Sequence, residues 1–223
     1  MEEKNIISNL SKQELAAQLR KPEGSNGKAV GKQMNKGNKF ICLNSYKILN
    51  PHKNSLVLEI GMGNGLFIKD LFNISNPLKY IGLDFSQTMI DEATTSNQNF
   101  MNQQKVSFIK GSVETLPFED NSIDYVTTTN TIYFWPNLIE NTKEIYRVLK
   151  PNGKLLIGYR SKELMDQIEV ANYSFNKYTV DEIEQLLKNI GFQKIDTEII
   201  PEPDLDFDGK IMKMAGCYSI GIK

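Results

Sequence analysis

The feature that most constrains this chain is an apolar segment that runs directly into three alternating glycines, Gly61, Gly63 and Gly65. Leu56–Ile60 is apolar except for Glu59, as expected of a parallel strand buried on both faces. Glycine lacks a Cβ, so the backbone can turn tightly after this strand and approach a ligand closely. A helix expected from about residue 66 would direct its free N–H groups at that ligand. The pattern predicts a strand, a ligand-binding turn and a helix.

The glycine spacing excludes two common phosphate-binding motifs. A dinucleotide fingerprint needs glycine at the sixth position, where this chain has Leu66. A P-loop needs a Gly-Lys-Ser/Thr sequence, which is absent. A second apolar segment ends in Asp84, 23 residues after Gly61, where a carboxylate can accept hydrogen bonds from both ribose hydroxyls of a nucleoside. The alternative is a surface turn followed by a helix-capping acid.

Strand and helix patterns alternate along the rest of the chain, which predicts a doubly wound, mostly parallel sheet. Such sheets bind ligands beyond the carboxyl ends of their strands, so residues 61–65, Asp84, Gly111 and Asn130 are expected to lie together. A capping box begins at Thr179, and Gly191 ends the helix that follows it. The expected helices are 66–73, 87–101, one that starts at Pro136, and 180–190; the expected later strands are 106–109, 123–129, 154–159, 192–200 and 212–222.

The chain resembles the class I S-adenosylmethionine-dependent methyltransferases, in particular the small-molecule type with methyltransferase domain 11. Five pieces carry the resemblance, in the family's order: residues 57–65, 81–86, 111–118, 118–126 and 144–154. The resemblance implies a Rossmann-like seven-stranded sheet with a C-terminal antiparallel hairpin, and S-adenosylmethionine as the cofactor.

The resemblance also assigns cofactor contacts. The three glycines would face the methionine part and Asp84 the ribose. One departure is Ser112, where many relatives carry Asp in the segment that contacts adenine. The full set of expected contact residues is Glu59, Gly61, Gly63, Gly65, Asp84, Phe85, Ser86, Met89, Ser112, Val113, Glu114 and Asn130.

Methyl transfer from a sulfonium needs few catalytic side chains, because the donor is already activated and the protein must mainly align the reactants and exclude water. No catalytic residue is assigned, and no metal cluster is evident. Residues 130–133 lack the two prolines of nucleobase amino-methyltransferases, which disfavours that substrate. The acceptor-side candidates, for which plain packing is an alternative role, are Tyr133, Trp135, Tyr159 and Arg160.

The first 50 residues differ in composition from the rest. A capping box at Ser11 is followed by several glycines between residues 24 and 37, which suggests hinges between short amphipathic pieces. We therefore expect an N-terminal helical cap or lid over residues 1–50 and a cofactor-binding domain over residues 51–223. A solvated helix-and-loop segment is the alternative.

Composition restricts partners and location. The balance of 26 basic and 27 acidic residues gives no reason to expect nucleic acid. The absence of a membrane-spanning run and of a signal-peptide pattern favours the cytoplasm. The acidic residues 202–208 are expected to form a solvated hairpin connection, or else to steer a cationic substrate. Oligomeric state stays open.

Methylation of a small-molecule acceptor is the function that these features favour. Three alternatives remain at this stage: a methyltransferase of protein or RNA, an aminopropyltransferase, and a non-catalytic S-adenosylmethionine-binding protein. The aminopropyltransferase would need an acidic pair near the fourth strand, which Asn130 and Thr131 do not supply.

Overall fold

A single seven-stranded sheet forms the centre of the computed structural model, which describes residues 7–76, 79–207 and 210–223. The strand order is β3-β2-β1-β4-β5-β7-β6. The first five strands in this order are parallel, and β7 runs antiparallel to both β5 and β6. The fold expected from the sequence is therefore confirmed. The strands are β1 (Leu56–Ile60), β2 (Lys79–Asp84), β3 (Val106–Lys110), β4 (Ile123–Thr129), β5 (Leu149–Tyr159), β6 (Gln193–Phe207) and β7 (Lys210–Ile222).

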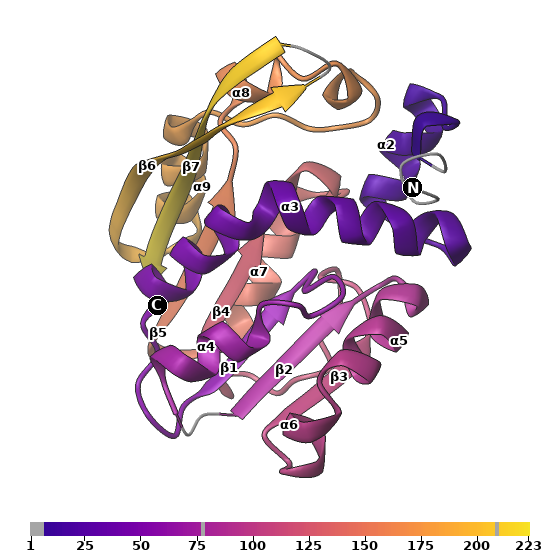
Figure 1. The fold of residues 1–223 in the computed structure, drawn as a ribbon. Helices are drawn as coiled ribbons and strands as arrows, with labels where there is room; N and C mark the ends of the chain where they lie inside the picture. The colour runs from indigo at the N-terminus through magenta and orange to yellow at the C-terminus, as the bar shows by residue number, and fades with distance from the viewer. Residues whose placement is uncertain (1–6, 77–78, 208–209) are drawn as a thin grey trace.

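Helices cover both faces of the sheet, and α3 lies across the molecule (Figure 1). One apolar cluster joins the sheet to α7 and α9, and a second joins it to α3, α4 and α5. Within the described residues, every helix is too short or too polar to cross a membrane. The helices are α2 (Lys12–Arg20), α3 (Gly24–Leu49), α4 (Ile68–Ile74), α5 (Gln87–Ser96), α6 (Gln98–Asn102), η1 (Ile132–Phe134), α7 (Leu138–Val148), α8 (Lys162–Met165), η2 (Glu169–Asn172) and α9 (Val180–Ile190).

Both predicted capping boxes are confirmed. Ser11 caps α2 and Thr179 caps α9, each with the glutamate three residues later completing the reciprocal bonds. Gly191 ends α9 in the left-handed conformation, with a φ of 114°, as a glycine after a helix commonly does.

The expectation of hinges between residues 24 and 37 is wrong, because α3 is one continuous helix of 26 residues. Two of its glycines, Gly27 and Gly31, instead permit close packing. A Cβ on Gly27 would lie 2.5 Å from the carbonyl carbon of Pro22, and a Cβ on Gly31 would lie 3.0 Å from Cε of Met89. These contacts hold α3 against its surroundings and offset the helix-weakening effect of glycine.

Two other helix boundaries also differ from expectation. The predicted helix 87–101 is divided at Asn97, whose Nδ2 donates to the carbonyls of Gly65 at 3.1 Å and Ala93 at 3.0 Å. This amide links the break to the glycine-rich turn. Pro136 lies before α7 rather than in its first turn, because Asn137 is the N-cap.

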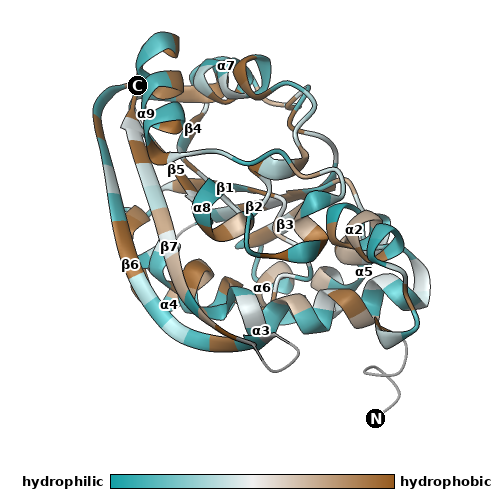
Figure 2. Ribbon diagram, turned by 90° about the horizontal axis from the view of Figure 1, so that it is seen from above, coloured by the Kyte–Doolittle hydropathy of each residue, from teal (hydrophilic) through white to brown (hydrophobic). Residues whose placement is uncertain are grey.

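The acidic segment is mostly strand rather than a connecting loop. β6 continues to Phe207 and pairs with β7 through Leu205 and Asp206; Asp208 lies outside the described residues. Hydrophilic and hydrophobic residues alternate along this hairpin in Figure 2. The side chain of Glu202 is buried and forms an ion pair with Arg160 at 2.8 Å.

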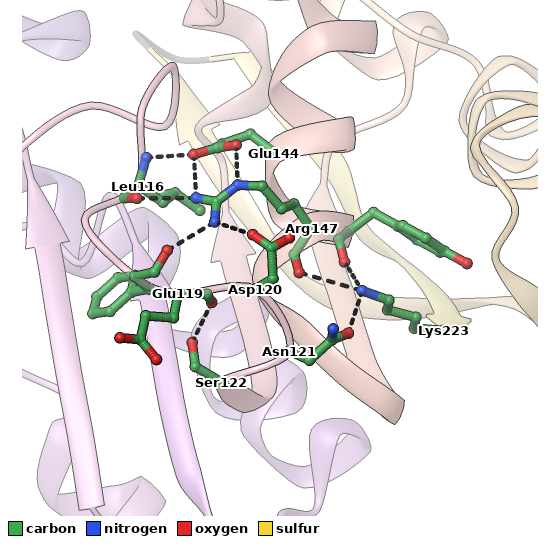
Figure 3. A network of polar contacts seen from close by, with 10 residues as sticks. Leu116, Glu119, Asp120, Asn121, Ser122, Glu144, Arg147 and Lys223 are labelled. Atoms are coloured by element: carbon green, nitrogen blue, oxygen red, sulfur yellow. Dashed lines mark hydrogen bonds and ion pairs between the residues drawn. The ribbon is translucent and has the colours of Figure 1, made fainter.

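A polar network ties the loop between β3 and β4 to α7 (Figure 3). Glu144 accepts a hydrogen bond from the main-chain N–H of Leu116 at 2.8 Å. Arg147 donates to the carbonyls of Leu116 at 3.1 Å and Phe118 at 2.8 Å, and pairs with Asp120 at 2.8 Å. The network fixes residues 116–120, which directly follow the cavity-lining residues 112–114 in the same loop, to α7.

Candidate functional site

A cavity lies at the carboxyl ends of the parallel strands, where a doubly wound sheet binds its ligand. The turn after β1, the end of β2, the loop after β3 and the end of β4 supply one side, and α2 and α3 supply the other. Sequence segments more than 100 residues apart, such as α2 and the end of β4, thus line one cavity.

The glycine-rich turn requires glycine at its alternating positions. Gly61, Gly63 and Gly65 have φ values of 70°, 59° and 66°. Residues other than glycine rarely adopt such positive φ values. A Cβ on Gly61 would collide with Cγ2 of Thr131, and one on Gly65 would lie 2.9 Å from Nδ2 of Asn97. The turn therefore keeps a bare backbone toward the cavity, because the positive φ disfavours a side chain at all three positions and space is also lacking at Gly61 and Gly65.

Asp84 connects the end of β2 to the glycine-rich turn. Its Oδ2 accepts from the N–H of Gly63 at 3.0 Å, and its Oδ1 accepts from the N–H of Ser86 at 2.8 Å. Burial raises the pKa of Asp84 to about 6, although these main-chain hydrogen bonds act in the opposite direction. A buried carboxylate at this position suits a ligand with hydroxyl donors.

Glu59 is held between two tyrosines. Its Oε2 accepts from the hydroxyls of Tyr46 on α3 at 2.6 Å and Tyr80 on β2 at 2.8 Å. Burial raises the pKa of Glu59 to about 7, while the two phenolic hydrogen bonds lower it. Both bonds use the same oxygen, so the carboxyl group can still accept from a ligand in the cavity.

The loop after β3 brings a hydroxyl and a carboxylate together. Ser112 Oγ donates to Glu114 Oε2 at 2.9 Å and accepts from the N–H of Glu114 at 3.3 Å. Both residues line the cavity, as does the buried Val113.

Most of the residues predicted from the sequence come together around this cavity. Phe85, Met89, Asn130 and Trp135 line it, in addition to the residues described above. Ser86 does not line it, because this residue caps α5 and its hydroxyl donates to the carbonyl of Pro22.

Three of the four acceptor-side candidates also lie behind the wall rather than on it. Tyr159 is fully buried, and its hydroxyl lies 3.1 Å from Oγ of Ser219. Tyr133 and Arg160 contact each other and reach the cavity only through neighbouring residues. Tyr159 and Arg160 instead turn to the hairpin, where their partners are Ser219 on β7 and Glu202 on β6.

The sequence analysis expected a cap over residues 1–50 but named none of the α3 residues that line the cavity. Met34, Asn38, Cys42 and Tyr46 line the cavity at intervals of four residues, so they form one stripe of the helix. The spacing was visible in the sequence, but the glycines among these residues suggested turns. Leu19, Arg20 and Pro22, around the end of α2, complete this side.

The fold and cavity define an α/β protein with a cavity at the carboxyl edge of its sheet, whose glycine-rich turn and buried Asp84 suit a nucleoside-type ligand. Residues 58–157 match the model of the methyltransferase domain family. The chain is 28% identical over 142 residues to an uncharacterized methyltransferase, YdaC, of Bacillus subtilis, covering 64% of this chain and 74% of that relative.

Quinone-modifying enzymes are also among the relatives. The C-methyltransferase UbiE of ubiquinone and menaquinone biosynthesis in Rickettsia prowazekii is 34% identical over 110 residues, covering 48% of this chain and 44% of the relative. A demethylmenaquinone methyltransferase of Oceanobacillus iheyensis is 33% identical over 124 residues, covering 51% and 52%. The chain spans about half the length of these two relatives.

Solved structures share the fold. A Haloferax volcanii chain in complex with a methyltransferase activator superposes with a TM-score of 0.76 at 19% identity, covering 87% of this chain and 92% of that one. A methyltransferase from Aquifex aeolicus superposes with a TM-score of 0.64 at 19% identity, covering 89% and 99%. The family match identifies residues 58–157 as a methyltransferase domain similar to S-adenosylmethionine-dependent methyltransferases, and the solved structures share its fold.

Proposed function

We propose that this chain transfers the methyl group of S-adenosylmethionine to a small-molecule acceptor. The observation that carries the proposal is the position of α3, whose cavity-facing stripe covers the carboxyl edge of the sheet. An acceptor that reacts beneath this helix must be small enough to enter the cavity. The names of the quinone methyltransferases among the relatives also favour a small-molecule acceptor.

The cofactor is proposed to extend along the edge from the glycine-rich turn to the loop after β3. The turn would contact the methionine part, Asp84 the ribose, and residues 112–114 the adenine. Glu59, with one oxygen free of phenolic hydrogen bonds, suits a cationic group of the cofactor. In this arrangement residues 1–50 act as the cap of a cofactor-binding domain that comprises residues 51–223.

The reaction is an in-line displacement. A lone pair of the acceptor forms a bond to the methyl carbon while the carbon–sulfur bond breaks, and sulfur keeps the electron pair as S-adenosylhomocysteine leaves. The protein contributes alignment and exclusion of water, which can supply about 7–11 kcal/mol of the barrier reduction.

Calorimetric titration with S-adenosylmethionine and S-adenosylhomocysteine tests the cofactor site. Asp84→Ala should weaken the binding of both by about 1–3 kcal/mol, because their ribose hydroxyls lose an acceptor. Asp181→Asn, an exposed acid in the first turn of α9, is the control and should leave both affinities unchanged. Failure of the unmodified protein to bind either ligand would refute the proposal.

Incubation of cell extract with the protein and a cofactor labelled in its methyl group tests the acceptor class. Label in a low-molecular-weight product is the expected result. Label found only in protein or RNA would contradict a small-molecule acceptor while leaving the methyltransferase activity intact.

A further inference from the structure

A chain of hydrogen bonds runs from the end of β5 to the α3 side of the cavity. The main-chain N–H of Arg160 donates to the hydroxyl of Tyr133. That hydroxyl donates to Oδ1 of Asn130 at 3.0 Å, and Nδ2 of Asn130 donates to Oδ1 of Asn38 at 3.0 Å. Asn130 and Asn38 line the cavity, whereas the first two residues lie behind it.

The hydrogen bond from Arg160 to Tyr133 sets the donor-to-acceptor direction of the whole series. A main-chain N–H can only donate, so the Tyr133 hydroxyl accepts from Arg160 and must place its own proton elsewhere. Two oxygens lie near it: Oδ1 of Asn130 at 3.0 Å and the carbonyl of Arg160 at 3.4 Å. The second distance exceeds the range of O–H···O hydrogen bonds. Burial raises the pKa of Tyr133 well above its usual range, so the phenol keeps its proton.

The same donor-to-acceptor direction fixes the orientation of the side-chain amides of Asn130 and Asn38. Because Oδ1 of Asn130 receives the phenolic proton, Nδ2 of Asn130 points to Asn38 and donates to Oδ1 of that residue. The Nδ2 group of Asn38 has no hydrogen-bond partner in the described part of the chain and can donate to a ligand. Asn38 is half-buried, and it lines the cavity.

The side chain of Arg160 fixes the same turn of α3 from behind. Its Nη2 donates to the carbonyl of Gly37 at 3.3 Å and pairs with Glu202 at 2.8 Å. Gly37 directly precedes Asn38, and the guanidinium and its carboxylate partner are only 5% and 3% exposed. Arg160 therefore positions both ends of the chain, through its main chain at Tyr133 and its side chain beside Asn38.

The charged groups around this part of α3 are Arg160 and Glu202, which pair with each other at 2.8 Å, and Glu59, which two tyrosines hold. The neighbours along the α3 stripe are neutral. Met34 and Cys42 lie one turn before and one turn after Asn38 on α3, and Phe134 and Trp135 contribute aromatic side chains to the same cavity. Burial raises the pKa of Cys42 well above its usual range, so it remains a neutral thiol. A directed N–H donor in such surroundings suits an uncharged oxygen.

We propose that Asn38 is a specificity-determining residue whose amide N–H binds an oxygen of the methyl acceptor. The acceptor is then an uncharged, mainly apolar molecule that carries a carbonyl or an equivalent oxygen. Tyr133 and Arg160 are positioning residues that fix the direction of the Asn38 amide. This inference rests on the proposed function, since it concerns the acceptor side of the same cavity.

Two bicyclic probes of matched shape test the proposal: 1-tetralone, which has a carbonyl, and tetralin, which has none. Both are titrated into ¹⁵N-labelled protein saturated with S-adenosylhomocysteine, and dissociation constants are taken from amide NMR shifts. The ketone should bind about fivefold more tightly than the hydrocarbon, as expected for one hydrogen bond. It should also shift the side-chain NH₂ signals of Asn38.

Three variants separate recognition from folding. Asn38→Asp keeps an oxygen for Asn130 but replaces the donor with an acceptor, so the preference for the ketone should disappear. Tyr133→Phe removes the group that sets the amide direction and should reduce the preference. Asn35→Asp is the matched control, because Asn35 lines the cavity on the same helix but lies outside the chain of hydrogen bonds.

Each result decides the question. Equal binding of both probes, absence of ketone binding by the loaded protein, or an unchanged preference in Asn38→Asp overturns the proposal. Loss of the preference in Asn35→Asp alone also overturns it, because the recognising amide would then be a different one. Unchanged binding of S-adenosylhomocysteine shows that a variant is folded. Failure of the unmodified protein to bind that ligand would instead refute the proposed function.

Discussion

Replacement of Glu59 by Gln should stabilise the unliganded protein at alkaline pH. Burial raises the pKa of Glu59 from 4.5 to about 7, so between these values the unfolded chain has lost a proton that the folded protein retains. Stability therefore falls as the pH rises through this window. At about 1.4 kcal/mol per pKa unit, the loss is about 3 kcal/mol once the pH exceeds the folded pKa.

Glutamine preserves the local contacts without titrating. Its side-chain oxygen can accept from the hydroxyls of Tyr46 and Tyr80 as the carboxylate does. Burial also raises the pKa values of both tyrosines and of Cys42, so these neighbours keep their protons throughout. Asp84, whose pKa is raised to about 6, titrates in both proteins, and its effect cancels in the comparison.

Urea denaturation of the protein and of Glu59→Gln at about pH 5 and about pH 8 measures the effect. The variant should be more stable than the unmodified protein by about 3 kcal/mol at the higher pH and by about 1 kcal/mol or less at the lower pH. Parallel pH dependences, or a variant that is less stable at the higher pH, would refute the reasoning.

Two further substitutions test how the site is supported. Gly61→Ala should destabilise the protein by at least about 1–2 kcal/mol, because φ is 70° and Thr131 occupies the space of the new Cβ; Gly37→Ala, helical and unobstructed, should stabilise it by about 0.5–1 kcal/mol. Arg147→Ala should cost about 1–3 kcal/mol and weaken cofactor binding, because the loop after β3 loses its anchors. Lys143→Ala, which breaks only an exposed ion pair, should change stability by less than about 0.5 kcal/mol.

Urea denaturation and calorimetry check these outcomes. Equal effects of alanine at the two glycine positions would mean that backbone conformation does not decide which glycine is required. If Arg147→Ala left cofactor affinity unchanged, the loop after β3 would not need α7 to hold its position.

The sequence by itself determined the sheet, the glycine-rich turn and the acid at the end of β2. Each of these depends on local chemistry. Alternating apolar segments specify the strands and helices, and positive φ values require glycine at residues 61, 63 and 65. The order of the elements then places Asp84 and Asn130 at the same carboxyl edge, because parallel strands all end there.

Only the tertiary structure decided how the glycines of α3 are used and which residues of the acceptor side face the cavity. The same glycines could serve as hinges or as close-packing positions, and the contacts with Pro22 and Met89 select the second role. Tyr133 and Arg160 act through Asn38, more than 90 residues away in the chain. A hydrogen bond needs two groups at a defined distance and direction, and for groups so far apart in sequence only the folded chain supplies both.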